Sequence, residues 1–402
     1  MTKTEEIIAK HRKYVARNYS PVPVVPAGAS NVAVVDIEGR SFVDMMSCYS
    51  AVSVGHRHPK ILAELNRQAN NLANVSRAFF NNQLPDYAEL LCSICKMNVM
   101  LPMNTGAEAV ETAIKIARKW GYKKKNVPKD KAEIIVCDNN FHGRTTTIVG
   151  FSSEDQYKDS FGPFTPGFVS VPFGDIDSLQ KAINKNTVAF LIEPIQGEAG
   201  VVLPPRGFLA KARVLCMKNN VLFIADEIQT GLGRTGKIFA CDHEGVRPSM
   251  YILGKALGGG VMPVSAVVSH WQIMDVINPG DHGSTFGGGP LACAVAKKYL
   301  EIMLEEKLAE NSKKLGEYLK KDLLKIKSPY VKEVRGKGLF IGVELKRNSG
   351  GAKHFAEELA KVGVLTSSTH DFVLRFAPPL TITKDHIDWA IERIKKVLTT
   401  KN

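Results

Sequence analysis

The stretch that decides the fold is Tyr251-Ile252-Leu253-Gly254-Lys255-Ala256-Leu257-Gly258-Gly259-Gly260. Its apolar beginning predicts a short buried strand, which is followed by a lysine and a run of glycines. A second apolar run, Leu222-Phe223-Ile224-Ala225-Asp226-Glu227, predicts another buried strand that ends on carboxylates. Because a charge at the end of a buried strand is costly without a partner, these residues indicate a site at the carboxyl edge of a parallel sheet.

The same two regions carry a family resemblance. Asp226-Glu227-Ile228-Gln229-Thr230-Gly231 and the segment 253–260 resemble the motifs of the pyridoxal-phosphate aminotransferases of subgroup III, and more closely those of the ornithine δ-aminotransferases. The resemblance extends from about Tyr19 to about Pro379. It implies an α/β protein of fold type I, in which a mostly parallel seven-stranded sheet lies between helices in a large domain, with a smaller α+β domain beside it.

The order of predicted elements agrees with such a fold. Between about residues 85 and 290, strand patterns alternate with helix patterns, as expected for a parallel sheet with helices on both faces. After about residue 300 the pattern changes to helices followed by strands and a final helix. We expect an N-terminal arm and helix that pack with the small domain (1–48), a large cofactor-binding domain (49–300) and a C-terminal small α+β domain (301–402).

Composition favours a cytoplasmic protein that binds small molecules. The chain has 402 residues, 44% of them hydrophobic and 23% charged, which is ordinary for a globular protein. No apolar run approaches the roughly 20 residues of a membrane span, and the beginning lacks the apolar core of a signal peptide. The net charge is +13, but the lysines are dispersed and do not alternate with aromatic residues, so we expect no nucleic-acid partner. A basic surface suits anionic metabolites and a phosphate-bearing cofactor.

Three other patterns in the sequence resemble site motifs. Cys92 and Cys95 form one C-x-x-C without a second pair, which favours small core residues, with a redox role as the alternative. His56 and His58 supply too few ligands for a metal, so no metal site is predicted. Residues 231–236 fit G-x-G-x-x-G, but they do not directly follow the strand, which argues against a dinucleotide site.

Lys255 and Asp226 are the predicted catalytic residues. A desolvated lysine loses its proton more easily, and a neutral amine can form a Schiff base with a carbonyl. The resemblance assigns Lys255 to the lysine that carries pyridoxal 5'-phosphate and later moves a proton. It assigns Asp226 to the carboxylate that keeps the cofactor ring nitrogen protonated, and Gln229 to the phenolic oxygen of the ring. Without the resemblance, a solvated lysine and a helix-capping aspartate are the alternatives.

Phosphate binding is expected at the start of a helix. Thr105 is the expected N-cap of a helix that begins at Gly106 and Ala107, whose amides then point outward. Plain helix capping is the alternative. In the family this turn binds the cofactor phosphate. Ser284 and Thr285 resemble the segment that reaches the same phosphate from the neighbouring subunit, which implies a homodimer with active sites at the subunit interface.

Phe141-His142-Gly143-Arg144 follows another predicted strand. An arginine can bind a carboxylate through two parallel hydrogen bonds. By resemblance, Phe141 stacks on the cofactor ring, His142 belongs to the cofactor-binding set, and Arg144 binds the α-carboxylate of ornithine. The alternatives are a core phenylalanine and a solvated arginine.

The remaining predicted residues concern substrate choice. By resemblance, Glu198 pairs with Arg375 and switches between the two half-reactions: it neutralises the arginine when ornithine presents its δ-ammonium and releases it for the α-carboxylate of glutamate or 2-oxoglutarate. A static ion pair is the alternative. Tyr19 is assigned to the α-amino end of ornithine and Tyr49 to the distal pocket, with a core or interface role as the alternative for each.

The resemblance thus implies a transaminase that moves the δ-amino group of L-ornithine to 2-oxoglutarate, giving glutamate and glutamate 5-semialdehyde, which cyclises to pyrroline-5-carboxylate. Within the same class, the alternative is an N-acetylornithine or 4-aminobutyrate aminotransferase. From another class, the alternative is an inactive binding protein with the same fold.

Overall fold

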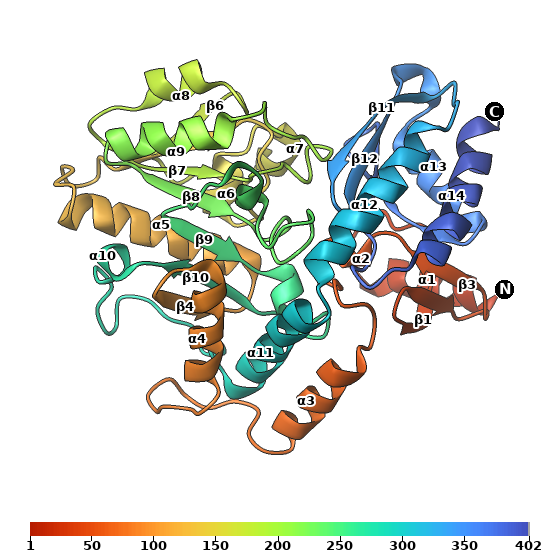
Figure 1. The fold of residues 1–402 in the computed structure, drawn as a ribbon, viewed down its shortest axis with the longest axis horizontal. Helices are drawn as coiled ribbons and strands as arrows, with labels where there is room; N and C mark the ends of the chain where they lie inside the picture. Colours follow the sequence, from red (N-terminus) through yellow and green to blue (C-terminus); the bar gives the residue numbers. More distant parts are fainter. Residues whose placement is uncertain (401–402) are drawn as a thin grey trace.

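The computed structural model describes residues 1–400, in which a central sheet lies between helices (Figure 1). Within these residues the sheet has seven strands in the order β4-β10-β9-β8-β7-β5-β6. The pairs from β9 to β6 are parallel, whereas β10 runs antiparallel to both β4 and β9. The strands are β4 (Val99–Met103), β5 (Glu133–Cys137), β6 (Phe168–Val171), β7 (Thr187–Ile192), β8 (Leu222–Asp226), β9 (Met250–Leu253) and β10 (Ser265–Ser269).

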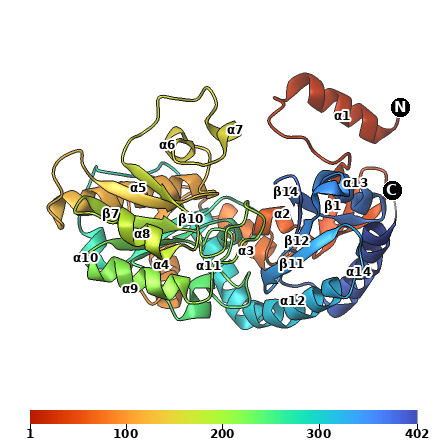
Figure 2. The ribbon, with the colours of Figure 1, turned by 90° about the horizontal axis from the view of Figure 1, so that it is seen from above.

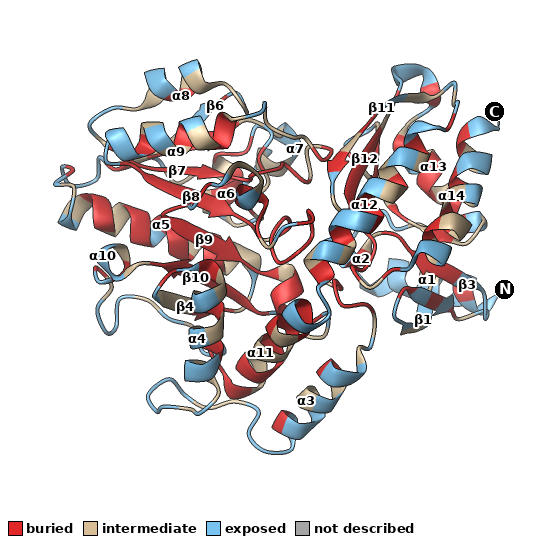
Figure 3. Cartoon of the chain, viewed as in Figure 1, coloured by how far each residue is buried: buried red, intermediate tan, exposed pale blue. Residues whose placement is uncertain are grey.

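Both faces of this sheet are buried, as the continuous apolar runs require. Along β5, Ile134 and Val136 join one apolar core, and Ile135 and Cys137 join the other. Figure 3 shows the strands as a buried layer between helices with exposed outer faces. The first core is covered by α5 (Gly106–Lys123), and the second by α4 (Leu84–Cys95), α9 (Phe208–Lys218) and α11 (Pro290–Glu305).

Shorter elements complete this part of the chain. The helices are α2 (Ser47–Ser50), α3 (Pro59–Ala69), α6 (Thr146–Gly150), α7 (Asp155–Lys158), α8 (Ile176–Ala182) and α10 (Trp271–Met274), with the 3₁₀ helices η1 (Ala240–Glu244) and η2 (Lys255–Gly258). Strands β8 and β9 are parallel neighbours in which Asp226 pairs with Ile252, and η2 begins at Lys255, after the single residue Gly254. The ends of these two strands therefore lie side by side.

The N-terminal and C-terminal parts of the chain lie on the same side of the molecule (Figure 1 and Figure 2). One sheet has the order β1 (Pro26–Ser30), β2 (Ala33–Asp36), β3 (Ser41–Asp44) and β13 (Val364–Leu365), and β13 is parallel to β3. A second sheet has the order β11 (Val331–Lys337), β12 (Phe340–Leu345), β15 (Val373–Phe376) and β14 (Ser367–Thr369). The helices are α1 (Lys3–Tyr14), α12 (Leu308–Leu324), α13 (Ala352–Lys361) and α14 (Lys384–Thr399), with the 3₁₀ helix η3 (Arg347–Ser349). The three-part division at 48 and 300 stays a prediction. Among the described residues, no helix is long and apolar enough to cross a membrane.

A buried arginine joins the central sheet region to the C-terminal region. Arg234 Nη1 donates to the carbonyls of Leu339 at 3.0 Å and Pro378 at 2.5 Å, and Nη2 donates to Ser47 Oγ at 3.2 Å and Ser53 Oγ at 3.1 Å. Burial lowers the pKa of Arg234 to about 10, which still leaves the guanidinium charged at neutral pH. Its hydrogen bonds therefore fix the relative position of segments far apart in the sequence.

Candidate active site

A cavity of about 140 Å³ lies where β7, β8 and β9 end. This is the edge of the sheet at which parallel α/β proteins bind ligands. The cavity is lined by Gly106, Ala107, Phe141, His142, Gly143, Glu193, Ile195, Glu198, Asp226, Ile228, Gln229, Thr230 and Lys255. The fold thus brings together eight of the residues singled out in the sequence: Gly106, Ala107, Phe141, His142, Glu198, Asp226, Gln229 and Lys255.

Lys255 enters this cavity from the first position of η2. Its backbone has φ of 43°, a left-handed conformation that costs a non-glycine residue on the order of 1–3 kcal/mol. Desolvation lowers the pKa of its amine; the Glu198 charge opposes this shift and the Arg375 charge reinforces it. A larger fraction of Lys255 is therefore neutral, and nucleophilic, than for an exposed lysine.

Asp226 is buried and is held by two contacts. Its Oδ2 lies 2.6 Å from His142 Nδ1, and its Oδ1 accepts a hydrogen bond from the Ile228 amide at 3.1 Å. Burial alone would lower the pKa of His142, but the hydrogen bond and charge of Asp226, with the charge of Glu193, outweigh burial and raise it. The other ring nitrogen, His142 Nε2, is buried and has no hydrogen-bond partner among residues 1–400. The contact with His142 thus fixes the position of the Asp226 carboxylate beside the cavity.

Glu193 is a cavity residue that the sequence analysis did not select. It directly follows β7 and accepts hydrogen bonds from the amides of Phe141 at 2.9 Å and Gly197 at 3.2 Å. Burial raises the pKa of its carboxyl to about 7, although the nearby His142 opposes this shift. The signal was present in the sequence, because Glu193 ends an apolar strand in the same way as Asp226 does.

The N-terminus of α5 forms one wall of the cavity. Thr105 caps the helix in a reciprocal arrangement: its hydroxyl accepts from the Glu108 amide at 3.3 Å, and Glu108 accepts from the Thr105 amide at 2.7 Å. Gly106 lies so close to Ile228 that an added Cβ would approach its Cδ1 to 3.0 Å. The first turn of α5 therefore presents amides and the positive end of the helix dipole with little side-chain obstruction.

Glu198 and Arg375 form an ion pair at the side of the cavity. Arg375 Nη1 lies 2.5 Å from Glu198 Oε1, and Gln229 Nε2 donates to the same oxygen at 3.3 Å. Desolvation by itself would raise the pKa of Glu198, but the charges of Arg375 and Lys255 outweigh it and lower the pKa. The arginine is only 1% exposed, and its Nε and Nη2 atoms have no partner within the described part of the chain. Its guanidinium retains donors for a further acceptor.

Tyr49 covers this arginine from a strained segment. The Arg375 guanidinium carbon lies 5.1 Å from the centre of the Tyr49 ring. All residues of α2 have positive φ, between 45° and 74°, although none is a glycine. The Ser47 amide donates to Asp44 Oδ1 at 2.8 Å, and the Ser47 hydroxyl accepts from Arg234. These contacts hold the strained segment in place.

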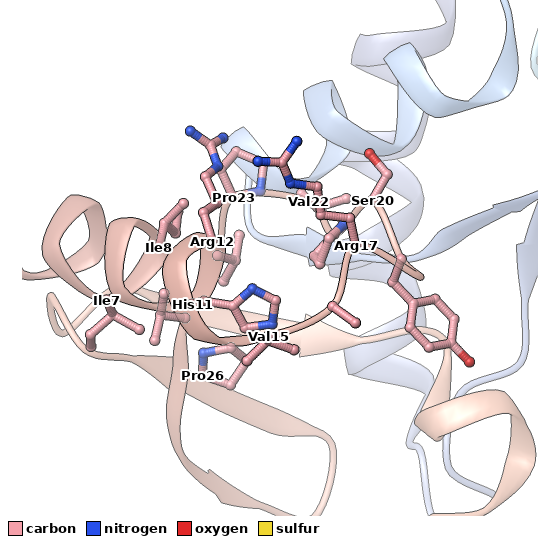
Figure 4. Close-up of a pocket in the computed structure, with 15 residues that line it drawn as sticks. Ile7, Ile8, His11, Arg12, Val15, Arg17, Ser20, Val22, Pro23 and Pro26 are labelled. Atoms are coloured by element: carbon pink, nitrogen blue, oxygen red, sulfur yellow. The ribbon is translucent and has the colours of Figure 1, made fainter.

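Other predicted residues lie outside this cavity. Arg144 is exposed and stacks on aromatic rings. Ser284 Oγ accepts from Asn104 Nδ2 at 2.7 Å, beside the start of α5, and neither it nor Thr285 lines the cavity. Tyr19 is 73% exposed and instead lines a cavity of about 660 Å³ between α1 and the arm that follows it. Figure 4 shows this cavity with its lining residues from both segments, among them His11 and Val22.

Comparison with known proteins gives the following matches. Residues 14–398 match the family described as aminotransferase class-III. The ornithine aminotransferase of Geobacillus is 57% identical over 99% of both chains, and that of Bacillus subtilis is 55% identical over 99% of this chain and 98% of the relative. The structure of the Toxoplasma gondii ornithine aminotransferase has a TM-score of 0.97 and 43% identity, covering 99% of this chain and 95% of that one. An acetylornithine aminotransferase structure from Elizabethkingia anophelis has a TM-score of 0.90 and 44% identity, with 99% of each chain covered.

Proposed function

Because the chain belongs to the class-III aminotransferase family, we propose that the cavity at Lys255 is the site of its ornithine aminotransferase activity. The predictions of fold type I and of a pyridoxal-phosphate cofactor are confirmed by these relatives. The reaction moves the δ-amino group of L-ornithine to 2-oxoglutarate and yields glutamate and glutamate 5-semialdehyde. The geometric observation that supports this choice of substrate best is the Glu198–Arg375 pair beside Lys255.

The cavity residues fit the cofactor. Bound pyridoxal phosphate supplies a conjugated ring that withdraws electrons from the substrate carbon at which a proton is lost. The amides at Gly106 and Ala107 would hold its phosphate, Asp226 its ring nitrogen and Gln229 its phenolic oxygen, while Phe141 would cover the ring. Two buried polar atoms of the cavity residues, His142 Nε2 and Gln229 Oε1, have no hydrogen-bond partner in the described chain. Both can therefore form a hydrogen bond with a polar ligand.

Lys255 and Asp226 would have complementary tasks. Burial favours the neutral amine of Lys255, and this amine would bind the cofactor. Once displaced by the substrate, it would accept the proton from the δ-carbon of ornithine and donate a proton back later in the amino transfer. The Asp226 carboxylate would stabilise positive charge at the ring nitrogen. His142 would hold that carboxylate in position through the 2.6 Å contact.

Glu198 and Arg375 would select between substrates. With the pair closed, the guanidinium charge is neutralised, so the ammonium end of ornithine can reach Lys255 without repulsion. With the pair open, Arg375 can bind the α-carboxylate of glutamate or 2-oxoglutarate through its remaining donors. Arg144 would bind a carboxylate in both half-reactions. In ornithine this is the single α-carboxylate, and in glutamate it is the side-chain carboxylate.

Replacing Glu198 by alanine should change the two half-reactions in opposite directions. We expect ornithine to react at least about tenfold more slowly, because its ammonium would meet an uncompensated guanidinium. The glutamate half-reaction should hold or improve, since no ion pair must open. Single-turnover absorbance of the bound cofactor with each amino donor measures both rates.

Glu198→Gln is the matched control, because it keeps the size and hydrogen-bonding capacity but removes the charge. It should reproduce the direction of the alanine effect. Thermal unfolding of both variants is needed, since removing one partner of a buried pair often costs roughly 3–5 kcal/mol. Equal rate losses for ornithine and glutamate in a well-folded variant would identify a static structural pair.

A homodimer with shared active sites is part of this proposal. The exposed aromatic residues Phe79, Phe80 and Phe286 support it, because solvent-exposed apolar groups of this size are typical of protein interfaces. The segment of Phe79 and Phe80 is joined to the segment of Phe286 by Asn81 Nδ2, which donates to the Gly288 carbonyl at 3.1 Å. In such a dimer Ser284 and Thr285 would reach the phosphate of the neighbouring site. A cytoplasmic location likewise stays a prediction.

The test of the function is a panel of amino donors with 2-oxoglutarate as acceptor. Ornithine, N-acetylornithine and 4-aminobutyrate are compared under the same conditions, and pyrroline-5-carboxylate is trapped as it forms. The proposal requires ornithine to have the highest kcat/KM. A preference for N-acetylornithine or 4-aminobutyrate would replace it by the corresponding alternative, and no turnover with any donor would favour the inactive binding protein.

A further inference from the structure

Tyr157 makes the closest ring contact with Arg144. It belongs to the short helix α7 (Asp155–Lys158), and its ring centre lies 3.7 Å from the Arg144 guanidinium carbon. The Phe141 ring lies 5.5 Å from the same carbon. The two rings meet edge to face, with centres 6.1 Å apart and planes at 79°. The guanidinium is therefore packed against two perpendicular aromatic surfaces.

The charge of Arg144 has no carboxylate partner in the described part of the chain. Within residues 1–400, no aspartate or glutamate forms an ion pair with it, although Arg375 nearby is paired with Glu198. A guanidinium stacked on a ring keeps its N–H groups in its own plane, at the edge away from the ring face. That edge is then free to donate two parallel hydrogen bonds to a ligand carboxylate.

Arg144 would be poorly ordered without this stacking. Its side chain is exposed, and fixing a free arginine side chain costs rotamer entropy. A ligand would otherwise have to order the arginine on binding, which weakens affinity. Cation–π contact with a tyrosine face at this distance orders the guanidinium before the ligand arrives.

We propose that Tyr157 is a positioning residue for the carboxylate site: it holds the Arg144 guanidinium stacked, with its N–H edge ready for the carboxylate that both substrates carry. This inference rests on the proposed role of Arg144. It differs from the role of Glu198 in one measurable respect. Since ornithine and glutamate both place a carboxylate at Arg144, loss of Tyr157 should weaken both substrates alike, whereas loss of Glu198 should separate them.

The test compares Tyr157→Leu with Tyr157→Phe in the cofactor-loaded enzyme. Leucine removes the ring, and we expect KM to rise about tenfold for ornithine and for 2-oxoglutarate, with kcat within about threefold of wild type. Phenylalanine keeps the ring and should restore KM to within about twofold. A purely structural role would instead lower kcat and the melting temperature together, without rescue specific to an aromatic ring.

Two further variants separate this inference from the function on which it rests. Arg144→Lys should raise KM by itself, and adding Tyr157→Leu to it should raise KM no further, because the stacked guanidinium is already gone. If Arg144→Lys leaves KM unchanged, the carboxylate role of Arg144 is wrong. If Arg144→Lys raises KM but Tyr157→Leu does not, or if Tyr157→Phe is as impaired as Tyr157→Leu, the positioning role of the Tyr157 ring is overturned.

Discussion

Lys255→Ala is expected to reduce ornithine turnover by at least about a thousandfold while the protein remains folded. The loss combines the removal of the nucleophilic amine with the removal of the group that moves the proton at the δ-carbon. We expect folding to be preserved because the buried Lys255 amine is desolvated, which lowers its pKa. Alanine removes this amine and with it the cost of its desolvation. Alanine keeps the left-handed backbone at no greater cost than lysine.

Turnover of ornithine and thermal unfolding of the purified variant check this expectation together. Lys237→Ala, a change to another lysine of the same region but outside the cavity lining, is the matched control and should keep wild-type activity. An Lys255→Ala enzyme that turned over ornithine at the wild-type rate would show that another residue carries the cofactor.

Asp226→Asn is expected to slow turnover by about a hundredfold to a thousandfold, the usual effect of removing one preorganised electrostatic group. Asparagine has almost the same shape, so the contact to His142 and the space for the cofactor should be kept. What would be lost is the negative charge that we propose stabilises the protonated ring nitrogen. The pKa of His142 should fall as well, since the hydrogen bond and charge of Asp226 are what raise it above its ordinary value.

The measurements are cofactor content, turnover and the titration of His142 by NMR. Full cofactor content with greatly reduced turnover fits the proposed role of Asp226. Wild-type turnover with a normal cofactor spectrum would contradict it. A loss of cofactor together with a loss of turnover would instead identify Asp226 as a residue needed mainly for binding.

The sequence predicted the fold from its most local signals. Two apolar runs that end at Asp226 and before Lys255 are buried neighbouring strands, β8 and β9, and Thr105 is the cap of the helix that forms the cavity wall. Such signals are reliable because burial on both faces and helix capping act within a few residues of the chain. The positions of Lys255 and Asp226 follow from them directly.

Other features depend on contacts that no local pattern contains. Tyr157 lies in a short helix without apolar periodicity, and its contact with Arg144 joins that helix to the loop after β5 only in the folded chain. Glu193 follows an apolar strand much as Asp226 ends one, so its place at the edge of the sheet was predictable. The family motif, however, assigns a role to Glu198 and not to Glu193. Site residues at the ends of strands can therefore be predicted from the sequence more readily than site residues that loops bring to the cavity.

The rejected G-x-G-x-x-G pattern has a structural explanation. Gly233 and Gly236 have φ of 96° and 88°, and both face α12: an added Cβ would lie 3.4 Å from the Ala309 amide nitrogen and 3.0 Å from the Lys313 Cα, respectively. The glycines thus allow the segment of Arg234 to approach α12 closely, where Ser312 Oγ donates to the Arg234 carbonyl at 2.7 Å. They serve packing between segments.

The proposed function requires that the δ-nitrogen, and not the α-nitrogen, of ornithine is transferred. Ornithine labelled with ¹⁵N at the δ-position and incubated with 2-oxoglutarate tests it directly by mass spectrometry of both products. Transfer of the δ-nitrogen places the label in glutamate and leaves pyrroline-5-carboxylate unlabelled, because the ring then closes through the α-nitrogen. This is the result that the arrangement of Lys255, Glu198 and Arg375 predicts. Unlabelled glutamate, with the label retained in the cyclised product, would show α-transamination and contradict the account.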